Sequence, residues 1–145
     1  LVLCDAITWA QRKGAKKIID MATLTGACVA ALGKNYTGAF TNSQSFLKEL
    51  EKHSQKTEEK LWQLPVDEDF HKQVRASNVA DMNNCVIGTG AGSSLAAAFL
   101  EEFIDEGVEW IHLDIAGSSD FSDEKPYMAK GATGVLVRTL GEMFR

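Results

Sequence analysis

The residues of this sequence best suited to chemistry are small hydroxylated side chains at the end of an apolar segment. The stretch from Ile18 to Ala27 reads IIDMATLTGA, so a buried-strand pattern leads directly into threonines and a glycine. In α/β proteins ligands bind at the carboxyl ends of strands, where small side chains let a ligand approach the backbone. Thr23 and Thr25 add hydroxyls that can orient it. We therefore expect a binding edge here, although this pattern alone does not name its chemistry.

A second candidate pair is His112 and Asp114, which lie two residues apart in a strand pattern and so point to one face. Such a pair can bind a metal ion, or act as a base with the group that orients it. The alternative, which we favour, is a buried histidine whose ring is hydrogen-bonded by a neighbouring carboxylate. His71 and His53 lie in charged helical segments, and we expect both at the surface.

A glycine-rich segment from Gly88 to Gly92, GTGAG, precedes a helical pattern and resembles a phosphate-binding loop. It lacks the lysine of a P-loop and follows a loop rather than a strand, so neither nucleotide-binding fingerprint is satisfied. We favour a structural turn over nucleotide binding. The sequence also contains no HExxH and no GxSxG motif, so no complete catalytic set is visible.

Composition indicates a globular protein: the 145 residues are 45% hydrophobic and 24% charged. A net charge of −5 gives no basic footprint for nucleic acid. No apolar run approaches the roughly 18 residues that a membrane span needs. Cys4, Cys28 and Cys85 are widely spaced without a CxxC pair, which predicts buried, reduced thiols in a cytosolic protein.

Strand and helix patterns alternate along the chain, which predicts an α/β fold: a layered α/β/α domain with a mixed or mostly parallel sheet. Strands are expected at 17–22, 36–41 and 109–115, helices near 3–12, 25–32, 43–60, 65–77, 93–105 and 133–144, and loops at 78–92 and 116–126. The first helix pattern has no capping residue before it. We therefore expect residues 1–145 to be a carboxyl-terminal fragment of a longer chain.

Six segments, in order, resemble the carboxyl-terminal part of the catalytic domain of the leucine (leucyl, or cytosol) aminopeptidase family. They are DMATLTGA (20–27), YTGAFTN (36–42), ADMNN (80–84), GAGSSLAAAFLEEF (90–103), HLDIAG (112–117) and PYMAKGATG (126–134). The resemblance implies a cytoplasmic homo-hexamer that removes leucine and similar amino-terminal residues from peptide substrates, with no membrane partner. It also implies two divalent metal ions, manganese, zinc or magnesium, that activate a bridging water and polarise the scissile carbonyl.

In that family the metal ligands and the catalytic lysine and arginine belong to segments that would precede Leu1, including the signature NTDAEGR. The resemblance thus implies no metal ligand and no catalytic residue in this chain, and an inactive chain in isolation.

The positions with an implied substrate-binding role are Thr23, Leu24, Gly26, Cys85, Ala116 and Ser119. The first three would hydrogen-bond the peptide, and Cys85 and Ala116 would line the pocket for its amino-terminal side chain. Some relatives carry a larger residue such as Met where this chain has Ser119, and the smaller serine would widen or wet the pocket.

Other interpretations stay open. A non-catalytic assembly or DNA-binding module of a hexameric relative is one, although the acidic balance argues against DNA. A nucleotide-binding protein that uses GTGAG is another. The threonines at 23 and 25 could simply cap the following helix, and core packing suits Cys85 as well as pocket lining does.

Overall fold

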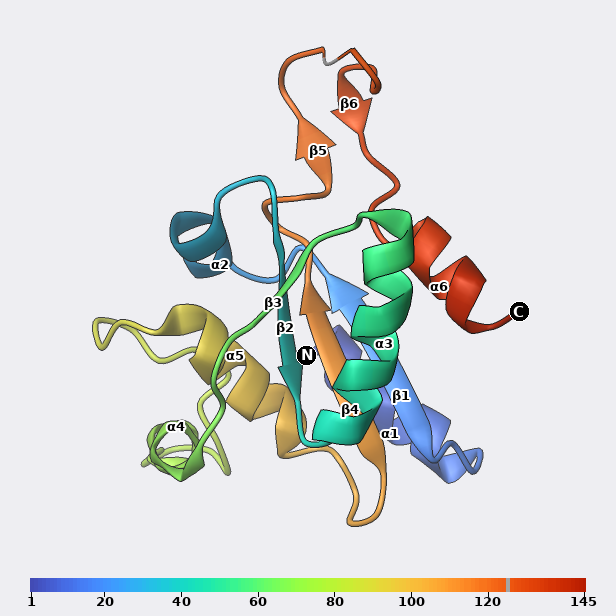
Figure 1. Ribbon diagram of the computed structural model, residues 1–145. Coiled ribbons are helices and arrows are strands. Elements are labelled where there is room, and N and C mark those ends of the chain that lie inside the picture. Colours follow the sequence, from blue (N-terminus) through green and yellow to red (C-terminus); the bar gives the residue numbers. More distant parts are fainter. Residues whose placement is uncertain (125) are drawn as a thin grey trace.

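Strands and helices alternate along residues 1–124 and 126–145, which are the residues described by this computed structural model (Figure 1). In chain order the elements are α1 (Val2–Arg12), β1 (Lys17–Ala22), α2 (Gly26–Leu32), β2 (Thr37–Thr41), α3 (Gln44–Thr57), β3 (Leu61–Gln63), α4 (Glu68–Arg75), α5 (Gly92–Glu101), β4 (Glu109–Asp114), β5 (Asp120–Phe121), β6 (Gly131–Ala132) and α6 (Val137–Met143). Among these described elements, no helix combines the length and apolarity needed to cross a membrane.

The central sheet has four strands in the order β1-β4-β2-β3. Strand β1 runs parallel to β4 and β2 runs parallel to β3, whereas β2 and β4 are antiparallel. The sheet is therefore mixed, as expected. In the register of the first pair Ala22 lies opposite Asp114, so β1 and β4 reach their carboxyl ends at the same edge of the sheet.

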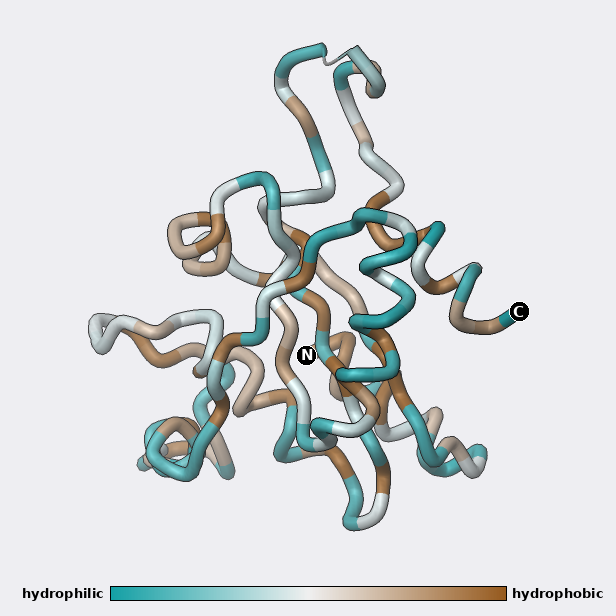
Figure 2. The backbone as a smooth tube through the Cα atoms, viewed as in Figure 1, coloured by the Kyte–Doolittle hydropathy of each residue, from teal (hydrophilic) through white to brown (hydrophobic). Residues whose placement is uncertain are grey.

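Alternating strand residues fill two hydrophobic cores, one on each face of the sheet. Helices α1, α4 and α5 pack with Ile18, Phe40 and Trp110 on one face. Helices α3 and α6 pack on the other face, where Ile111 and Leu113 point. This period-two burial makes the α/β/α layers that the sequence predicts. Figure 2 shows hydrophobic stretches along the central strands and hydrophilic ones along α3.

Several helices begin where the sequence predicts a capping side chain. The Thr25 hydroxyl accepts from the Cys28 amide at 3.0 Å, and the Ser43 hydroxyl accepts from the Phe46 amide at 3.3 Å. Asp67 caps α4 by accepting hydrogen bonds from two backbone amides. Such side chains satisfy amides that have no partner inside the helix. Leu1, before α1, makes no side-chain cap, as its sequence indicates.

The predicted helix 43–60 ends earlier because Glu58 adopts a left-handed backbone, with φ of 59°. The next residue, Glu59, turns inward and accepts hydrogen bonds from the amides of Leu136 and Thr139, both at 2.9 Å. This carboxylate caps α6, which starts at Val137 rather than near Thr133. The sequence pattern did not reveal this long-range cap.

The predicted loop 116–126 contains a strand, and residue 125 of that loop lies outside the described residues. Strand β5 pairs antiparallel with β6, which displaces the start of the last predicted helix. The Thr133 amide donates to the Ser119 carbonyl at 3.0 Å, and the Thr133 hydroxyl donates to the Ser118 carbonyl at 2.7 Å. These two bonds hold Thr133 beside the residues that lead into β5, so Thr133 is not part of a helix.

Neither of the two histidines expected at the surface is fully exposed. The His71 ring lies between α4 and α5, 2.5 Å from a Glu102 oxygen and 3.1 Å from a Glu101 oxygen, with 13% of its side chain exposed. His53 is half-buried, and its Nδ1 atom is buried. The expectation fails for His71 because α4 packs its polar residues against two acids at the end of α5.

Candidate functional site

The carboxyl ends of β1 and β4 place two loop segments, residues 23–26 and 115–119, next to each other. The Ile115 amide donates to the Ala22 carbonyl at 2.9 Å, which extends the parallel pairing by one residue. Beyond this bond the two segments diverge from the sheet, the geometry in which α/β proteins bind ligands. We call the two segments together the strand-end edge.

The Asp114 side chain joins the two segments of the strand-end edge, and it is only 1% exposed. Its Oδ1 atom accepts from the amides of Leu24 and Ala116, both at 3.1 Å. Its Oδ2 atom accepts from the Thr25 amide at 3.1 Å and from the Thr25 hydroxyl at 2.7 Å. Four donors thus occupy the acceptor positions of the carboxylate, which leaves none for a metal ion.

His112 and Asp114 do not act as a pair. The Nδ1 atom of His112 lies 2.6 Å from an Asp20 oxygen, and the other Asp20 oxygen accepts from the Trp110 indole at 2.6 Å. The imidazole also stacks on the Phe40 ring, with centroids 5.8 Å apart. The favoured interpretation, a buried histidine beside a neighbouring carboxylate, is confirmed, and the carboxylate comes from β1.

Thr25 both caps a helix and belongs to the strand-end edge. Its hydroxyl accepts from the Cys28 amide while donating to Asp114. With Thr25 turned inward, its neighbours Thr23, Leu24 and Gly26 are exposed. The helix cap at Thr25 is therefore confirmed, and it leaves Thr23, Leu24 and Gly26 free of the cap, so their substrate-binding role stays a prediction.

A cavity of about 290 Å³ lies between the strand-end edge, the segment 76–91 and α5. Leu24, Thr25 and Cys85 line it, so the structure brings together residues from two distant parts of the sequence. Cys4 and Cys28 are buried as expected, whereas Cys85 is exposed. The expectation of a buried thiol is wrong for Cys85 because it belongs to an irregular segment that runs along the surface beside α5.

A second, mostly apolar cavity of about 270 Å³ shares Leu24 with the first one. Its other lining residues include Leu1, Ala22 and Phe99. Asn84 lines both cavities, although it was not among the substrate-binding positions predicted from the sequence. Its place in the ADMNN segment was the available signal, because a polar amide beside small and apolar residues can orient a ligand.

The remaining predicted positions lie on the other segment of the strand-end edge. Ala116 is half-buried and tied to Asp114 through its amide. The Ser119 amide donates to the Ile115 carbonyl at 3.0 Å. Neither residue lines the two cavities in the described part of the chain, so the structure brings Ala116 close to Leu24 through Asp114 but does not place Ser119 with Cys85.

The glycine-rich segment 88–92 forms a turn before α5. Gly88 and Gly90 have φ of 87° and 77°, a left-handed backbone that favours glycine. A Cβ on Gly92 would lie 3.1 Å from the Ala27 Cβ, which shows that α5 packs closely on α2. These features support the structural turn that we favoured over a phosphate-binding loop.

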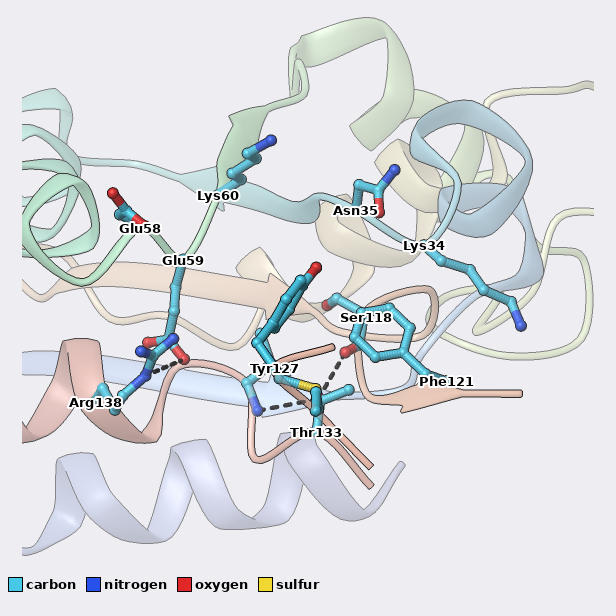
Figure 3. Close-up of a pocket in the computed structure, with 12 residues that line it drawn as sticks. Lys34, Asn35, Glu58, Glu59, Lys60, Ser118, Phe121, Tyr127, Thr133 and Arg138 are labelled. Atoms are coloured by element: carbon cyan, nitrogen blue, oxygen red, sulfur yellow. Dashed lines mark hydrogen bonds and ion pairs between the residues drawn. The ribbon is translucent and has the colours of Figure 1, made fainter. Parts of the chain in front are cut away.

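Figure 3 shows a separate hollow of about 170 Å³ between the β5–β6 hairpin and the residues that follow α2 and α3. Lys34, Lys60 and Arg138 line it together with hydroxyl and aromatic side chains. Its buried acid, Glu59, is already engaged in capping α6. None of the six predicted substrate-binding residues lines this hollow, so it is distinct from the strand-end edge.

A metal centre does not assemble from the residues described here: outside residue 125, no three His, Cys, Asp or Glu side chains gather so as to hold an ion. The strand-end edge exposes main chain beside two cavities, each large enough to hold one side chain. Hydrogen bonds to Asp114 fix the position of that main chain. Such an arrangement suits the binding of an extended backbone and one side chain.

These features define a class of protein: a layered α/β domain whose strand-end edge is a candidate ligand-binding site. Comparison with known proteins identifies the family, because the catalytic domain of the cytosol aminopeptidase family matches residues 1–141. The chain belongs to the cytosol aminopeptidase family.

The individual relatives agree with this assignment. A "Probable cytosol aminopeptidase" of Aquifex aeolicus is 45% identical over 139 residues, which are 96% of this chain and 28% of the relative. One of the same description from Bacillus subtilis is 43% identical over 99% of this chain and 28% of the relative. A solved structure of a mutant tomato leucine aminopeptidase superposes with a TM-score of 0.87 at 44% identity, covering 97% of this chain and 27% of that one. The chain therefore spans less than a third of the length of these relatives.

Proposed function

We propose that this chain supplies the substrate-binding part of a metal-dependent aminopeptidase that hydrolyses the amino-terminal residue, leucine or a similar one, from peptides. The observation that carries the proposal is the strand-end edge, where exposed Thr23, Leu24 and Gly26 surround a Thr25 that is fixed by buried Asp114, beside a cavity of about 290 Å³. Membership in a family of aminopeptidases supports the reaction class.

In this proposal each part of the edge has a separate role. The main chain of Thr23, Leu24 and Gly26 hydrogen-bonds the peptide backbone. Leu24 and Cys85 contact the amino-terminal side chain in the cavity that they line. Ala116 and Ser119 do not line that cavity; in this proposal they contact the amino-terminal side chain from the β4 side of the edge, where Ser119 leaves more room than a larger apolar residue would.

Two divalent metal ions, manganese, zinc or magnesium, are part of the proposal. Bound in the enzyme, such ions lower the pKa of water and polarise the scissile carbonyl. The described residues do not fit them, because no group of three suitable side chains assembles and the acceptor positions of Asp114 are filled. We therefore assign the ligands and the catalytic residues to polypeptide outside these 145 residues, and the chain alone is inactive.

The enzyme is further proposed to be a cytoplasmic homo-hexamer that acts on peptides and not on nucleic acid. The names of the relatives support a cytosolic location. The net charge of −5 supports the absence of nucleic-acid binding, because such binding depends on neutralising phosphates with cations.

The test compares the full-length polypeptide with residues 1–145 alone, using leucine p-nitroanilide as substrate. After removal of metal with a chelator, Mn²⁺ or Zn²⁺ should restore p-nitroaniline release by the full-length polypeptide and should give none with the isolated chain. Release by the isolated chain would place catalysis within these residues and contradict the assignment. A full-length polypeptide that stays inactive with every metal would overturn the function.

A further inference from the structure

We propose that Asp114 is a positioning residue that holds Leu24 and Thr25 in place in the wall of the substrate pocket by tying them to the carboxyl end of β4. This inference rests on the proposed function and names the group that determines its side-chain selectivity. The observation is that one buried carboxylate accepts four hydrogen bonds, three from residues 24–25 and one from residue 116.

Apart from the bonds to Asp114, the hydrogen bonds described for the two segments join them only where their strands end. Leu24 and Asp114 are 90 residues apart in the sequence, so no local turn connects them. The backbone bond from Ile115 to Ala22 fixes where the strands end but not the course of the residues beyond it. The side chain of Asp114 is therefore the connection that orients the Leu24 and Thr25 amides relative to Ala116.

The strength of this connection follows from its chemistry. Hydrogen bonds to a carboxylate are roughly twice as strong as neutral ones. In the described structure no lysine or arginine pairs with Asp114, so backbone amides and one hydroxyl provide its stabilisation. Those donors have definite directions, unlike a flexible cationic side chain. The carboxylate consequently fixes the local backbone as well as stabilising it.

The pocket is where loss of this carboxylate would be felt. Leu24 lines both cavities, and Thr25 lines the larger one. If their amides lost the acceptor on Asp114, both residues would move more freely in the pocket wall, and the cavity would accept side chains less selectively. The reacting groups, which we place outside these residues, would keep their own ligands.

Asp114→Asn is the sharpest substitution because it preserves shape and changes one acceptor into a donor. The new amide nitrogen must face either the Thr25 amide and hydroxyl or the amides of Leu24 and Ala116. In either orientation the new NH2 group faces a backbone amide that can only donate, so two of the four hydrogen bonds lose their acceptor oxygen. Thr25→Val removes the hydroxyl bond to Asp114 together with the hydroxyl's cap on the Cys28 amide, and Thr25→Ser retains both as the conservative rescue.

Asp20→Asn is the matched control. Asp20 is a largely buried carboxylate on the adjacent strand β1, with hydrogen-bond partners Trp110 and His112 in the core. It should lower stability without contacting the strand-end edge. A general loss of stability would therefore affect both aspartate variants, whereas a change of selectivity is expected for Asp114→Asn alone.

The experiment measures kcat and KM of the full-length, metal-loaded polypeptide for leucine and alanine p-nitroanilides, and metal content in parallel. For Asp114→Asn, the KM for the leucine substrate should rise about ten-fold and the leucine-to-alanine preference should fall, while kcat changes less than about three-fold. Thr25→Val should show a smaller effect in the same direction, and Thr25→Ser and Asp20→Asn should keep the wild-type preference. Unchanged KM and preference in Asp114→Asn would overturn the inference.

Hydrogen exchange followed by mass spectrometry keeps the inference testable without catalysis. In the same polypeptide, Asp114→Asn should speed exchange of the amides in residues 23–28 at least about ten-fold relative to Asp20→Asn. Equal exchange in the two variants would refute the positioning role. If the wild-type polypeptide showed no peptidase activity but the exchange result held, the proposed function would fail while the structural role of Asp114 stood. Should Asp114→Asn fail to fold, Thr25→Val compared with Thr25→Ser tests the inference by KM and substrate preference, and by exchange in residues 23–26, which excludes the Cys28 amide that the hydroxyl also caps. An unchanged KM and preference in Thr25→Val would then overturn the inference.

Discussion

Gly117 lies directly against the carbonyl group of Gly33, in a contact that leaves no room for a side chain. A Cβ added at Gly117 would collide with that carbonyl oxygen, which belongs to the backbone and cannot move aside cheaply. We expect Gly117→Ala to lower the free energy of unfolding by at least about 2 kcal/mol, measured by urea denaturation. Gly141→Ala is the control: its Cβ would meet no atom within 4 Å inside α6, and it should stabilise by about 0.5 to 1 kcal/mol. Equal stabilities of the two variants would contradict the close contact.

Gly26→Ala separates substrate binding from stability. A Cβ at this position meets no atom of the chain within 4 Å, so it would project from the strand-end edge into the space that we assign to the peptide. The unfolding free energy should change by less than about 1 kcal/mol, while KM for leucine p-nitroanilide should rise about ten-fold in the full-length polypeptide. Ala30→Ser, at an exposed position of the same helix, should leave KM unchanged. A normal KM in Gly26→Ala would remove this residue from the binding edge.

The three cysteines should differ in reactivity towards a thiol reagent. Burial, together with the nearby charge of Asp114, raises the pKa of the Cys28 thiol to about 11. Burial also raises the pKa of Cys4 above its ordinary value. Because the thiolate is the reactive form, iodoacetamide at pH 8 should modify exposed Cys85 first, as shown by peptide mass mapping. Cys85→Ser should abolish the fast labelling, and rapid modification of Cys28 in the folded chain would contradict its burial.

Glu102 links α4 to α5 and should make their contact sensitive to acid. Burial tends to raise the pKa of Glu102, but hydrogen bonds from Arg75 and His71 outweigh it and hold the pKa below the ordinary value of 4.5. A lowered carboxyl pKa stabilises the folded state fully above the ordinary pKa, and this contribution is lost as pH falls through the lower, folded-state value. Glu102→Gln should therefore cost about 1 to 3 kcal/mol of unfolding free energy at pH 7 and much less near pH 3.

The comparison for Glu102 is Glu106→Gln, which changes an exposed acid in the turn after α5. Urea denaturation of that variant should match the wild type at both pH values. If Glu102→Gln and Glu106→Gln lost the same stability at pH 7, the hydrogen bonds from Arg75 and His71 would contribute nothing measurable to folding.

The sequence was sufficient for features that depend on local pattern. The alternation of apolar residues around Ile18 and Trp110 predicted strands with two buried faces, and the hydroxyls of Thr25 and Ser43 predicted helix starts. Strand patterns and helix starts each depend on residues that lie only a few positions apart in the sequence. The exposed segment after β1 was predicted for the same reason, since small residues following an apolar strand are a local signal, and its binding role stays a prediction.

Features that depend on distant partners were not predictable in this way. Glu59 sits in a run of charged residues that indicates a solvated helix end, yet it caps a helix some 77 residues further along the chain. His71 was expected at the surface because the two acids that contact it lie at the end of α5, far from it in the sequence. The bridging role of Asp114 has the same origin, because its donors at Leu24 and Thr25 become neighbours only when β1 and β4 pair.

That pairing has a consequence for the order in which the molecule is made. A ribosome must synthesise β4, some 90 residues after Leu24, before the acceptor for the Leu24 amide exists. Contacts of such long separation form slowly, because the intervening chain loses loop entropy before they stabilise it. Residues 23–26 therefore lack their hydrogen-bond acceptor on the nascent chain until β4 has been synthesised, and we expect their protection from a protease to appear only when β1 and β4 have paired.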